Sequence, residues 1–393
     1  MRKERLMLII AIALTFPWLM SLATSTHYPS HITAIISGLA VISAAFIISW
    51  SAEIAEIDIP RSLSLAVVAL LAVLPEYAVD MYFAWMAGKV GGDYVHYATA
   101  NMTGANRLLI GIGWSLVVFI AMFKLRRRCV ELDEGIRLET TILLIATLYS
   151  FTIPLRSEIH PIDSIFLISL FIAYIYLATK AYREEVELEG VPKYLASFST
   201  RLRRITVTIL LLFSAFVILV SVEAFAEGLI DTAKAFGFDE FLMVQWIAPL
   251  ASESPEFVVA IYLVRRLRVT AGVNALISSK VNQWTLLIGC LPVVYSIALG
   301  FLSPLPLDAR QREEILLTSA QSLFGLAIIS NLRISVWEAL ALLILFLAQF
   351  VYESIETRYI LSGMYIALSI PIILKERKNI KTAVRQVMKI IGS

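Results

Sequence analysis

Charged residues are scarce in this sequence. Asp, Glu, Lys and Arg make up 16% of its 393 residues, whereas 59% of the residues are hydrophobic. A soluble domain is about a quarter charged and about half apolar, so the composition argues against a soluble globular fold. The net charge of +2 gives no general basic surface for nucleic acid. The apolar residues also cluster into runs that can cross a hydrocarbon core of about 30 Å.

Cysteine and histidine are scarce as well. Cys129 and Cys290 are too few for a disulfide framework, and the four histidines lie near the expected helix ends without a zinc pattern. The sequence contains no phosphate-binding glycine loop, no nucleophile elbow and no dinucleotide fingerprint. An enzyme within the membrane would need a nucleophile and base, or a metal triad, at depth. We therefore expect no enzymatic activity and no resident cofactor.

Long apolar runs recur along the whole chain. About twelve of them are long enough to be membrane spans, and they lie near residues 6–24, 31–52, 62–88, 95–123, 139–155, 162–180, 205–235, 241–265, 270–301, 313–331, 334–355 and 358–375. In lipid each backbone polar group must be bonded within its own segment, so the spans are expected to be helices. The predicted fold class is an all-α polytopic membrane protein that is embedded in the lipid bilayer.

Lys and Arg predict the orientation of these spans. Basic residues gather at the N-terminus, after the fourth, sixth and eighth spans, and in the tail after the twelfth. With twelve spans all of these segments fall on one side, which the positive-inside rule makes cytoplasmic. We therefore expect a multi-pass protein of the cell membrane with both termini in the cytoplasm.

Each end of the chain allows two interpretations. The first run follows Arg2, Lys3 and Arg5 and contains Pro17, so it is either a retained helix or a cleaved signal peptide. The basic tail after residue 375 has apolar residues at helical spacing, namely Ile380, Val384, Val387 and Ile391. It is either a helix lying on the inner leaflet or a solvated charged end.

Three blocks of sequence occur twice in the same order. Ser51-Ala-Glu53 resembles Ser221-Val-Glu223, and Leu74-Pro75-Glu76 resembles Ser254-Pro255-Glu256. The third pair is Asn101-Met-Thr-Gly-Ala-Asn-Arg107 and Asn274-Ala-Leu-Ile-Ser-Ser-Lys280. The offset is roughly 170–180 residues each time, and roughly five spans, an odd number, separate the copies, so the two copies face opposite ways as in inverted-repeat transporters.

The repeat predicts how the chain is organised. We expect two inverted five-helix repeats plus one extra helix at each end. The predicted segments are an N-terminal helix with its outer loop (1–30), the first repeat (31–180), a cytoplasmic connecting loop (181–204), the second repeat (205–355), and a final helix with a basic amphipathic tail (356–393).

The two Pro-Glu pairs carry the most specific chemistry. A proline within a membrane helix removes a backbone bond and frees a carbonyl upstream. The adjacent carboxylates of Glu76 and Glu256 then lie at the depth of these carbonyls, and hard cations such as Ca2+ prefer such oxygen ligands. Alternatively, Pro75 and Pro255 form structural kinks whose glutamates pair with nearby basic residues.

These blocks resemble the calcium/cation antiporter superfamily, which includes the sodium/calcium and proton/calcium exchangers. Its repeats carry a G-T-S-L-P-E-like helix followed by a G-N-x-x-G-S-N-like helix. The resemblance implies that Glu76 and Glu256 are the metal ligands. Other positions that match or neighbour the motifs, and so are implied in ion binding, are Ser252, Glu253, Asn101, Asn274, Ser278 and Asn282.

The sequence also departs from the family pattern. The Thr-Ser of the first motif falls on Ala72 and Val73, and the serine of Gly-Ser-Asn falls on Ala105. In the second repeat, a shift of one residue would replace Ser278 and Asn282 by Ser279 and Gln283; we prefer the first register because it aligns Lys280 with Arg107. Lys280 and Arg107 are candidate tethered cations, that is, fixed positive charges that occupy a place where sodium would otherwise bind. The acidic residues that could pair with them are Asp80, Glu253, Glu76 and Glu256. Alternatively, the two basic residues form structural pairs away from the ion pathway or snorkel to the interface.

The resemblance therefore implies a secondary-active cation antiporter. The transported cation is expected to be Ca2+ or another divalent ion, exchanged for H+ or Na+ by alternating access at a site near the membrane midplane. Because the site has few hydroxyls and an extra carboxylate, proton coupling is favoured slightly over sodium coupling. The alternative is a channel or a non-transporting scaffold that retains the fold.

Overall fold

The computed structural model describes residues 2–58, 71, 73–180, 188–350 and 354–391, and these are almost entirely helical. The chain divides into two compact units, each built from two separate stretches of sequence. Unit 1 consists of Met1–Tyr82 and Tyr182–Pro255, and unit 2 of Phe83–Ala181 and Glu256–Ser393. Each unit therefore draws on both of the predicted repeats. The repeat bounds themselves stay a prediction.

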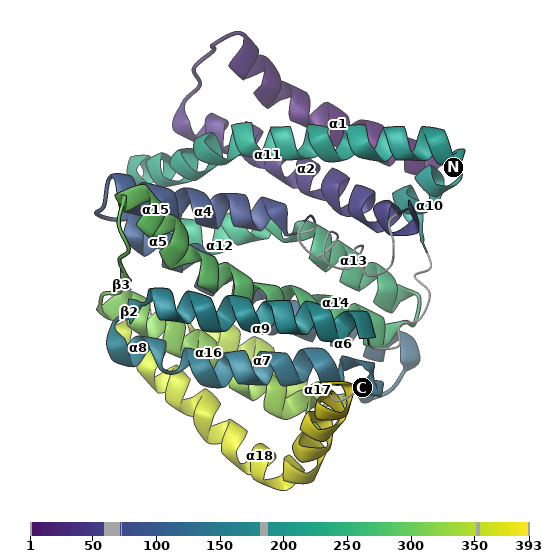
Figure 1. The fold of residues 1–393 in the computed structure, drawn as a ribbon, viewed down its shortest axis with the longest axis vertical. Coiled ribbons are helices and arrows are strands. Elements are labelled where there is room, and N and C mark those ends of the chain that lie inside the picture. Colours follow the sequence, from purple (N-terminus) through teal and green to yellow (C-terminus); the bar gives the residue numbers. More distant parts are fainter. Residues whose placement is uncertain (1, 59–70, 72, 181–187, 351–353, 392–393) are drawn as a thin grey trace. The chain divides into compact units, whose positions relative to one another are not determined.

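Unit 1 is built around two long helices that pack along each other. Its elements are α1 (Arg2–Ala23), α2 (Ser30–Asp58), the first part of α4 (Leu74–Lys89), α10 (Gly190–Ala196), α11 (Thr200–Phe236) and α12 (Glu240–Ser252). Helix α2 packs against α11 and also contacts α1 (Figure 1). A Cβ added at Gly228 of α11 would lie 2.9 Å from the backbone nitrogen of Ala34 in α2. The glycine thus permits the close approach of these two helices, as small residues do in membrane bundles.

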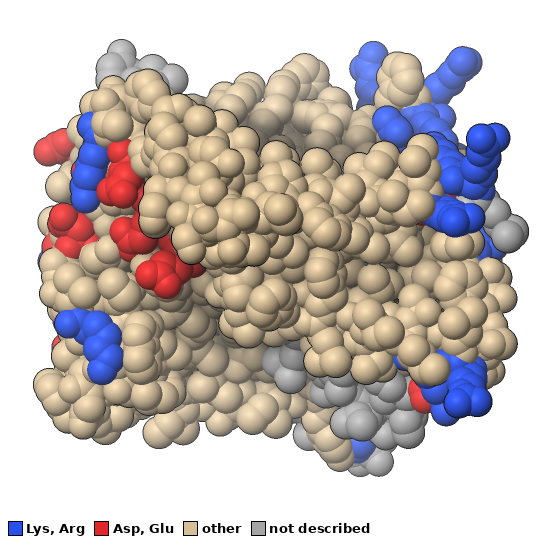
Figure 2. All heavy atoms as spheres, turned by 90° about the horizontal axis from the view of Figure 1, so that it is seen from above, with Lys and Arg blue, Asp and Glu red and all other residues tan. Residues whose placement is uncertain are grey.

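One cluster of charged residues in unit 1 lies at the ends of two helices. Asp58, at the end of α2, bonds Arg203 Nε at 2.8 Å and Arg204 Nε at 3.1 Å near the start of α11. On the face that Figure 2 draws, most Lys and Arg gather at one end, most Asp and Glu gather at the other end together with a few basic residues, and an uncharged band lies between the two ends. This distribution suits a membrane-spanning bundle. Which end faces the cytoplasm stays a prediction.

Unit 2 contains the remaining helices. They are the end of α4, α5 (Tyr94–Leu108), η1 (Leu109–Trp114), α6 (Ser115–Leu125), η2 (Glu134–Ile136), α7 (Arg137–Ser150), α8 (Ile153–Arg156), α9 (Pro161–Lys180), α13 (Ser254–Arg265), α14 (Val269–Asn282), η3 (Gln283–Leu287), α15 (Ile288–Leu299), α16 (Ala309–Ile329), α17 (Val336–Ala348) and α18 (Ile355–Ile391). Helix α16 lies at the centre of the unit, where it contacts α5, α7 and α18. Sixteen of its twenty-one residues are buried.

Two short antiparallel strand pairs join loops of unit 2. β1 (Cys129–Glu131) pairs with β4 (Arg333–Ser335), and β2 (Glu158–Ile159) pairs with β3 (Leu305–Pro306). Each pair links the predicted first half of the chain to the second. Because the strands are only two or three residues long, they tie helix ends together and leave the all-α class unchanged.

Helix α18 is continuous from Ile355 to Ile391 and is bent into two arms (Figure 1). Pro371 lies inside it and lacks the N–H that an unbroken helix needs. The second arm is the predicted basic tail. Ile380 and Val384 face a cavity bordered by α7 and α16, and Val387 is buried. The tail is therefore a helix whose apolar side packs on the protein.

The class of polytopic helical membrane protein is confirmed. Eight helices in the described part of the chain are long and apolar enough to cross a membrane, and α12 with α13 forms a ninth span if the bent pair is counted as one. The predicted spans near 313–331 and 334–355 appear as α16 and α17 but do not meet that test of length and composition. The predicted span at 62–88 ends as α4, and most of its residues that precede α4 lie outside the described residues. The count of twelve and the inverted repeat stay predictions.

Candidate ion-binding site

Both Pro-Glu pairs lie in the first turn of a helix. Pro75 and Glu76 are the second and third residues of α4, and Pro255 and Glu256 are the second and third residues of α13. Glu76 is 3% exposed, and Glu256 is half-buried. The prolines were expected inside helices, but each stands at a helix start. The reason is steric, because proline fits the first turn of a helix, whereas in a helix interior its ring clashes with the preceding turn.

Helix α12 ends immediately before the second pair. Glu253 is its C-terminal cap, and the Glu253 backbone N–H donates to the carbonyl of Pro249. The hydroxyl of Ser252 donates to the carbonyl of Ala248 at 3.2 Å. Both Ser252 and Glu253 are almost fully buried. The sequence Ser252-Glu253-Ser254-Pro255 thus creates a broken helix, and helix breaks in transporters expose carbonyls that can bind cations.

The predicted asparagine ligands lie on α5 and α14. Asn101 is fully buried, and its amide nitrogen and oxygen have no hydrogen-bond partner among the described residues. Asn274 is half-buried. A buried amide without a partner is costly, so Asn101 is suited to bind a group that the chain does not itself supply.

The other predicted ligands of α14 have different environments. Ser278 accepts a hydrogen bond from Tyr174 at 3.4 Å, and Asn282 is 4% exposed. In the alternative register, Gln283 donates to Ser279 at 3.4 Å. Both hydroxyls therefore have a partner within unit 2. The register stays a prediction.

Lys280 of α14 donates hydrogen bonds to Asn106 of α5, the helix that also carries Asn101. Its Nζ lies 3.1 Å from both the backbone oxygen and the Oδ1 of Asn106 on α5, and 5.0 Å from the ring centre of Trp284. The amide of Asn106 is oriented by its own bond from Nδ2 to the carbonyl of Met102. Lys280 has no exposed surface. The ammonium group therefore takes two oxygens of the kind that would otherwise suit a metal cation.

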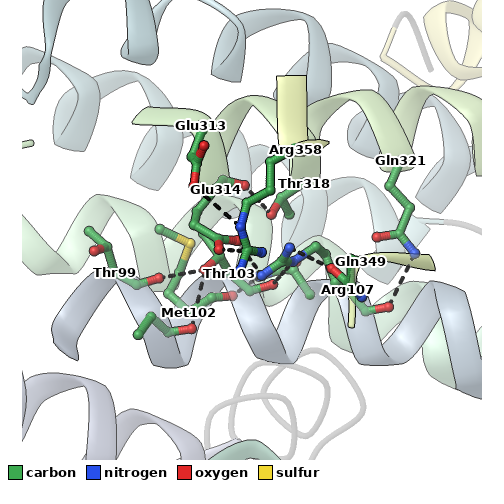
Figure 3. A network of polar contacts seen from close by, with 12 residues as sticks. Thr99, Met102, Thr103, Arg107, Glu313, Glu314, Thr318, Gln321, Gln349 and Arg358 are labelled. Carbon is green, nitrogen blue, oxygen red and sulfur yellow. Dashed lines mark hydrogen bonds and ion pairs between the residues drawn. The ribbon is translucent and has the colours of Figure 1, made fainter. Parts of the chain in front are cut away.

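Arg107 lies in a buried network with residues of α16 and α18 (Figure 3). It forms an ion pair with Glu314 and donates from Nη1 to Gln349 Oε1 at 2.7 Å. Arg358 of α18 contacts Glu313 at 3.2 Å and Glu314 at 2.7 Å. All four charged side chains are at most 2% exposed. Two arginines and two glutamates compensate one another, which is how buried charges are tolerated.

Glu313, Glu314 and Arg358 were not among the predicted site residues, and the carboxylates predicted to pair with Arg107 were different ones. A signal was present, because two adjacent glutamates in the apolar segment 313–331 call for buried partners. The identity of those partners depends on the packing of α5 and α18 against α16.

Helices α5 and α14 each change to a π-helix within three residues after their basic residue. η1 follows Arg107 in α5–η1–α6, and η3 follows Lys280 in α14–η3–α15. At the first junction, the carbonyl of Asn106 accepts from Lys280 and that of Arg107 accepts from Gln321 at 3.3 Å. π-helices often mark functional sites because they disturb the regular bonding of backbone carbonyls. At the junction of α5 and η1, side chains of α14 and α16 donate hydrogen bonds to these carbonyls.

The described residues form no preformed metal site of several charged or sulfur ligands. No group of three or more His, Cys, Asp or Glu side chains is arranged to hold an ion within the described residues. Glu76 belongs to unit 1 and Glu256 to unit 2, so their joint role as ligands stays a prediction.

A family model described as sodium/calcium exchanger protein matches residues 29–180 and 206–354, well over half of the chain. The chain belongs to the sodium/calcium exchanger protein family. The crystal structure of the H+/Ca2+ exchanger CAX is similar with a TM-score of 0.96 and 62% sequence identity, covering 99% of each chain. No match was found among curated protein sequences.

Two solved structures of lower sequence identity share the fold. The crystal structure of the Ca2+/H+ antiporter YfkE has a TM-score of 0.63 at 16% identity and covers 94% of this chain and 100% of its own. A structure of the sodium-calcium exchanger NCX_Mj soaked with Na+ and Sr2+ has a TM-score of 0.53 at 17% identity, covering 82% and 96%. Membership of the exchanger family confirms the resemblance found in the sequence motifs. The family and these structures are transporters.

Proposed function

We propose that the chain is an antiporter that exchanges Ca2+ for protons. The observation that carries this proposal is the likeness to the H+/Ca2+ exchanger CAX, at 62% identity over 99% of both chains. A likeness over nearly the whole of both chains supports a shared exchange reaction. It favours proton coupling over the sodium coupling that the sequence motifs alone leave open.

In this mechanism Glu76 and Glu256 supply the charge that offsets the dehydration of Ca2+. Neutral oxygens complete the site, and Asn101 and the end of α12 at Ser252 are the candidates with the most suitable surroundings. The same glutamates can carry protons in the return direction, since a carboxylate in an apolar setting binds a proton more readily than in water. Ca2+ and protons then compete for one pair of carboxylates, and competition for one site is sufficient for exchange.

Lys280 acts as a tethered cation in this proposal. The motif resemblance places Asn106 on the final asparagine of the family's second motif, and two oxygens of Asn106 bind the ammonium of Lys280. A sodium ion would have to displace that ammonium to use the same oxygens. The contact therefore supports exchange that does not depend on sodium. Arg107 has a different role here, as a structural partner of Glu314.

Transport by purified protein in liposomes tests the function. A Ca2+ indicator is enclosed, and an outward gradient of either protons or sodium is imposed at constant membrane potential. We expect Ca2+ uptake with the proton gradient, loss of uptake with a protonophore, and no uptake with the sodium gradient.

The other outcomes identify the alternatives. Uptake that follows the sodium gradient would refute proton coupling and the tethered-cation role of Lys280. Uptake that is independent of any opposing gradient would indicate a channel. A complete lack of flux by correctly folded protein would indicate a scaffold that retains the fold.

A further inference from the structure

Unit 2 contains an apolar cavity that is not lined by either Pro-Glu motif. Its volume is about 210 Å³, and it lies between α7, α16 and the second arm of α18. Lining residues include Arg137, Leu144 and Leu148 of α7, Leu326 of α16, and Ile380 and Val384 of α18. On α7 alone the lining runs from residue 137 to 148, which is roughly 16 Å at 1.5 Å per residue. An apolar cavity of about 150 Å³ already accepts benzene, so this one has room for a longer hydrocarbon chain.

Arg137 places a polar group at one end of this apolar space. Its Nη2 contacts Glu134 Oε1 at 2.9 Å, whereas its Nε and Nη1 are buried and have no hydrogen-bond partner among the described residues. Buried donors without an acceptor are unfavourable. A guanidinium whose free edge borders an apolar cavity is suited to an anionic group that is attached to a hydrocarbon chain.

The surroundings favour a lipid over a soluble anion. Leu148, at the far end of the α7 lining, is 56% exposed, so the cavity reaches the apolar outer surface of the helices. At the Arg137 end, Glu134 also accepts from Gln386 of α18 at 3.0 Å, which fixes this arm beside the start of α7. The same arm carries exposed basic residues, among them Lys381 and Arg385. Clusters of this kind attract anionic headgroups at a membrane surface.

We propose that the cavity binds one acyl chain of an acidic phospholipid, and that Arg137 donates hydrogen bonds to its phosphate. The acyl chain of the lipid extends along α7 toward Leu148, and the lipid headgroup lies beside the basic arm of α18. Because Arg358 of the same helix pairs with Glu313 and Glu314, a lipid that fixes α18 also supports the network around Arg107. This site is independent of the proposed ion exchange.

Native mass spectrometry of the purified full chain tests the site. The protein is titrated with dioleoyl phosphatidylglycerol, dioleoyl phosphatidylcholine or soluble glycerol 3-phosphate. We expect tighter binding of phosphatidylglycerol than of phosphatidylcholine, by about tenfold, because both lipids offer a phosphate but phosphatidylcholine also brings a choline ammonium that the Arg137 guanidinium repels. We expect no retention of glycerol 3-phosphate. Equal binding of the two lipids would overturn the role of Arg137. Glycerol 3-phosphate binding as tight as that of the lipid would overturn the role of the cavity.

Three variants assign the contacts. Arg137→Gln removes the charge and should abolish the preference for phosphatidylglycerol, and Ala383→Trp fills the cavity from α18 and should weaken both lipids. Arg127→Gln changes an exposed arginine that does not line the cavity and should bind like the wild type. If Arg137→Gln does not fold, Ala383→Trp still decides the question, because wild-type lipid binding by that variant would refute the cavity site.

Discussion

Arg358 of α18 and Glu314 of α16 form an ion pair with almost no exposed surface, in which Nη1 lies 2.7 Å from Oε1. The same glutamate pairs with Arg107, so one carboxylate joins the C-terminal helix to the helix that carries Asn101. Such a group has two positive neighbours and a negative one, Glu313, beside it. The packing of unit 2 around α5 therefore depends on a balance of buried charges.

Replacing Glu314 by Gln should destabilise the protein by about 3–5 kcal/mol, because two arginines lose a buried partner. The measurement is thermal unfolding of purified protein in detergent. Glu131→Gln is the matched control, since its pair with Arg333 is more than 60% exposed on both sides and should contribute less than about 1 kcal/mol. Equal losses for the two variants would show that the buried network does not determine stability.

Glu76→Gln and Glu256→Gln should each reduce Ca2+ uptake to about 1% of the wild-type rate or less, at matched membrane content. Glutamine keeps the size and one oxygen but removes the charge that binds the ion, and each 1.4 kcal/mol lost is a factor of ten. The assay is proton-driven uptake in liposomes. Glu53→Gln in α2, outside the Pro-Glu motifs, should change the rate only modestly. Near-normal uptake by either motif variant would make that Pro-Glu pair structural.

The inverted repeat predicts that Glu76 and Glu256 approach each other near the membrane midplane. With Cys129 and Cys290 replaced by alanine, a Glu76→Cys, Glu256→Cys double variant should then bind Cd2+ or Zn2+ between the two thiolates, which requires metal–sulfur distances near 2.3 Å. Thiol accessibility with and without the metal reports the bridge. Metal protection should be absent from each single-cysteine variant. If the double variant is no better protected than the singles, the predicted midplane site is wrong.

Lys280→Met should make Ca2+ transport sensitive to sodium. The variant keeps the length and apolar character of the stem but releases the two oxygens of Asn106, which sodium can then bind. We expect sodium to compete with Ca2+ uptake in this variant and to leave the wild type unaffected. Lys89→Met, which changes an exposed lysine at the end of α4, is the control. Uptake that remains insensitive to sodium in Lys280→Met would show that Lys280 does not replace a transported ion.

The sequence alone determined the class, the family and the identity of the candidate ligands. Apolar runs of membrane length have few structural solutions, because lipid offers the backbone no hydrogen bonds. The Pro-Glu motifs could be found because proline and a membrane carboxylate are both costly and therefore informative. The motif order also placed Lys280 and Arg107 at related positions, and in the structure a π-helix begins within three residues after each of them.

Tertiary structure alone decided which groups these residues meet. Arg107 and Glu314 are 207 residues apart in the sequence, and nothing local identifies one as the partner of the other. The same is true of Lys280 with Asn106 and of the cavity that α18 completes over α7. Spans and motifs follow from local hydropathy and backbone chemistry, whereas partners depend on how helices pack. Each buried charge demands compensation, but only the packing selects the residue that provides it.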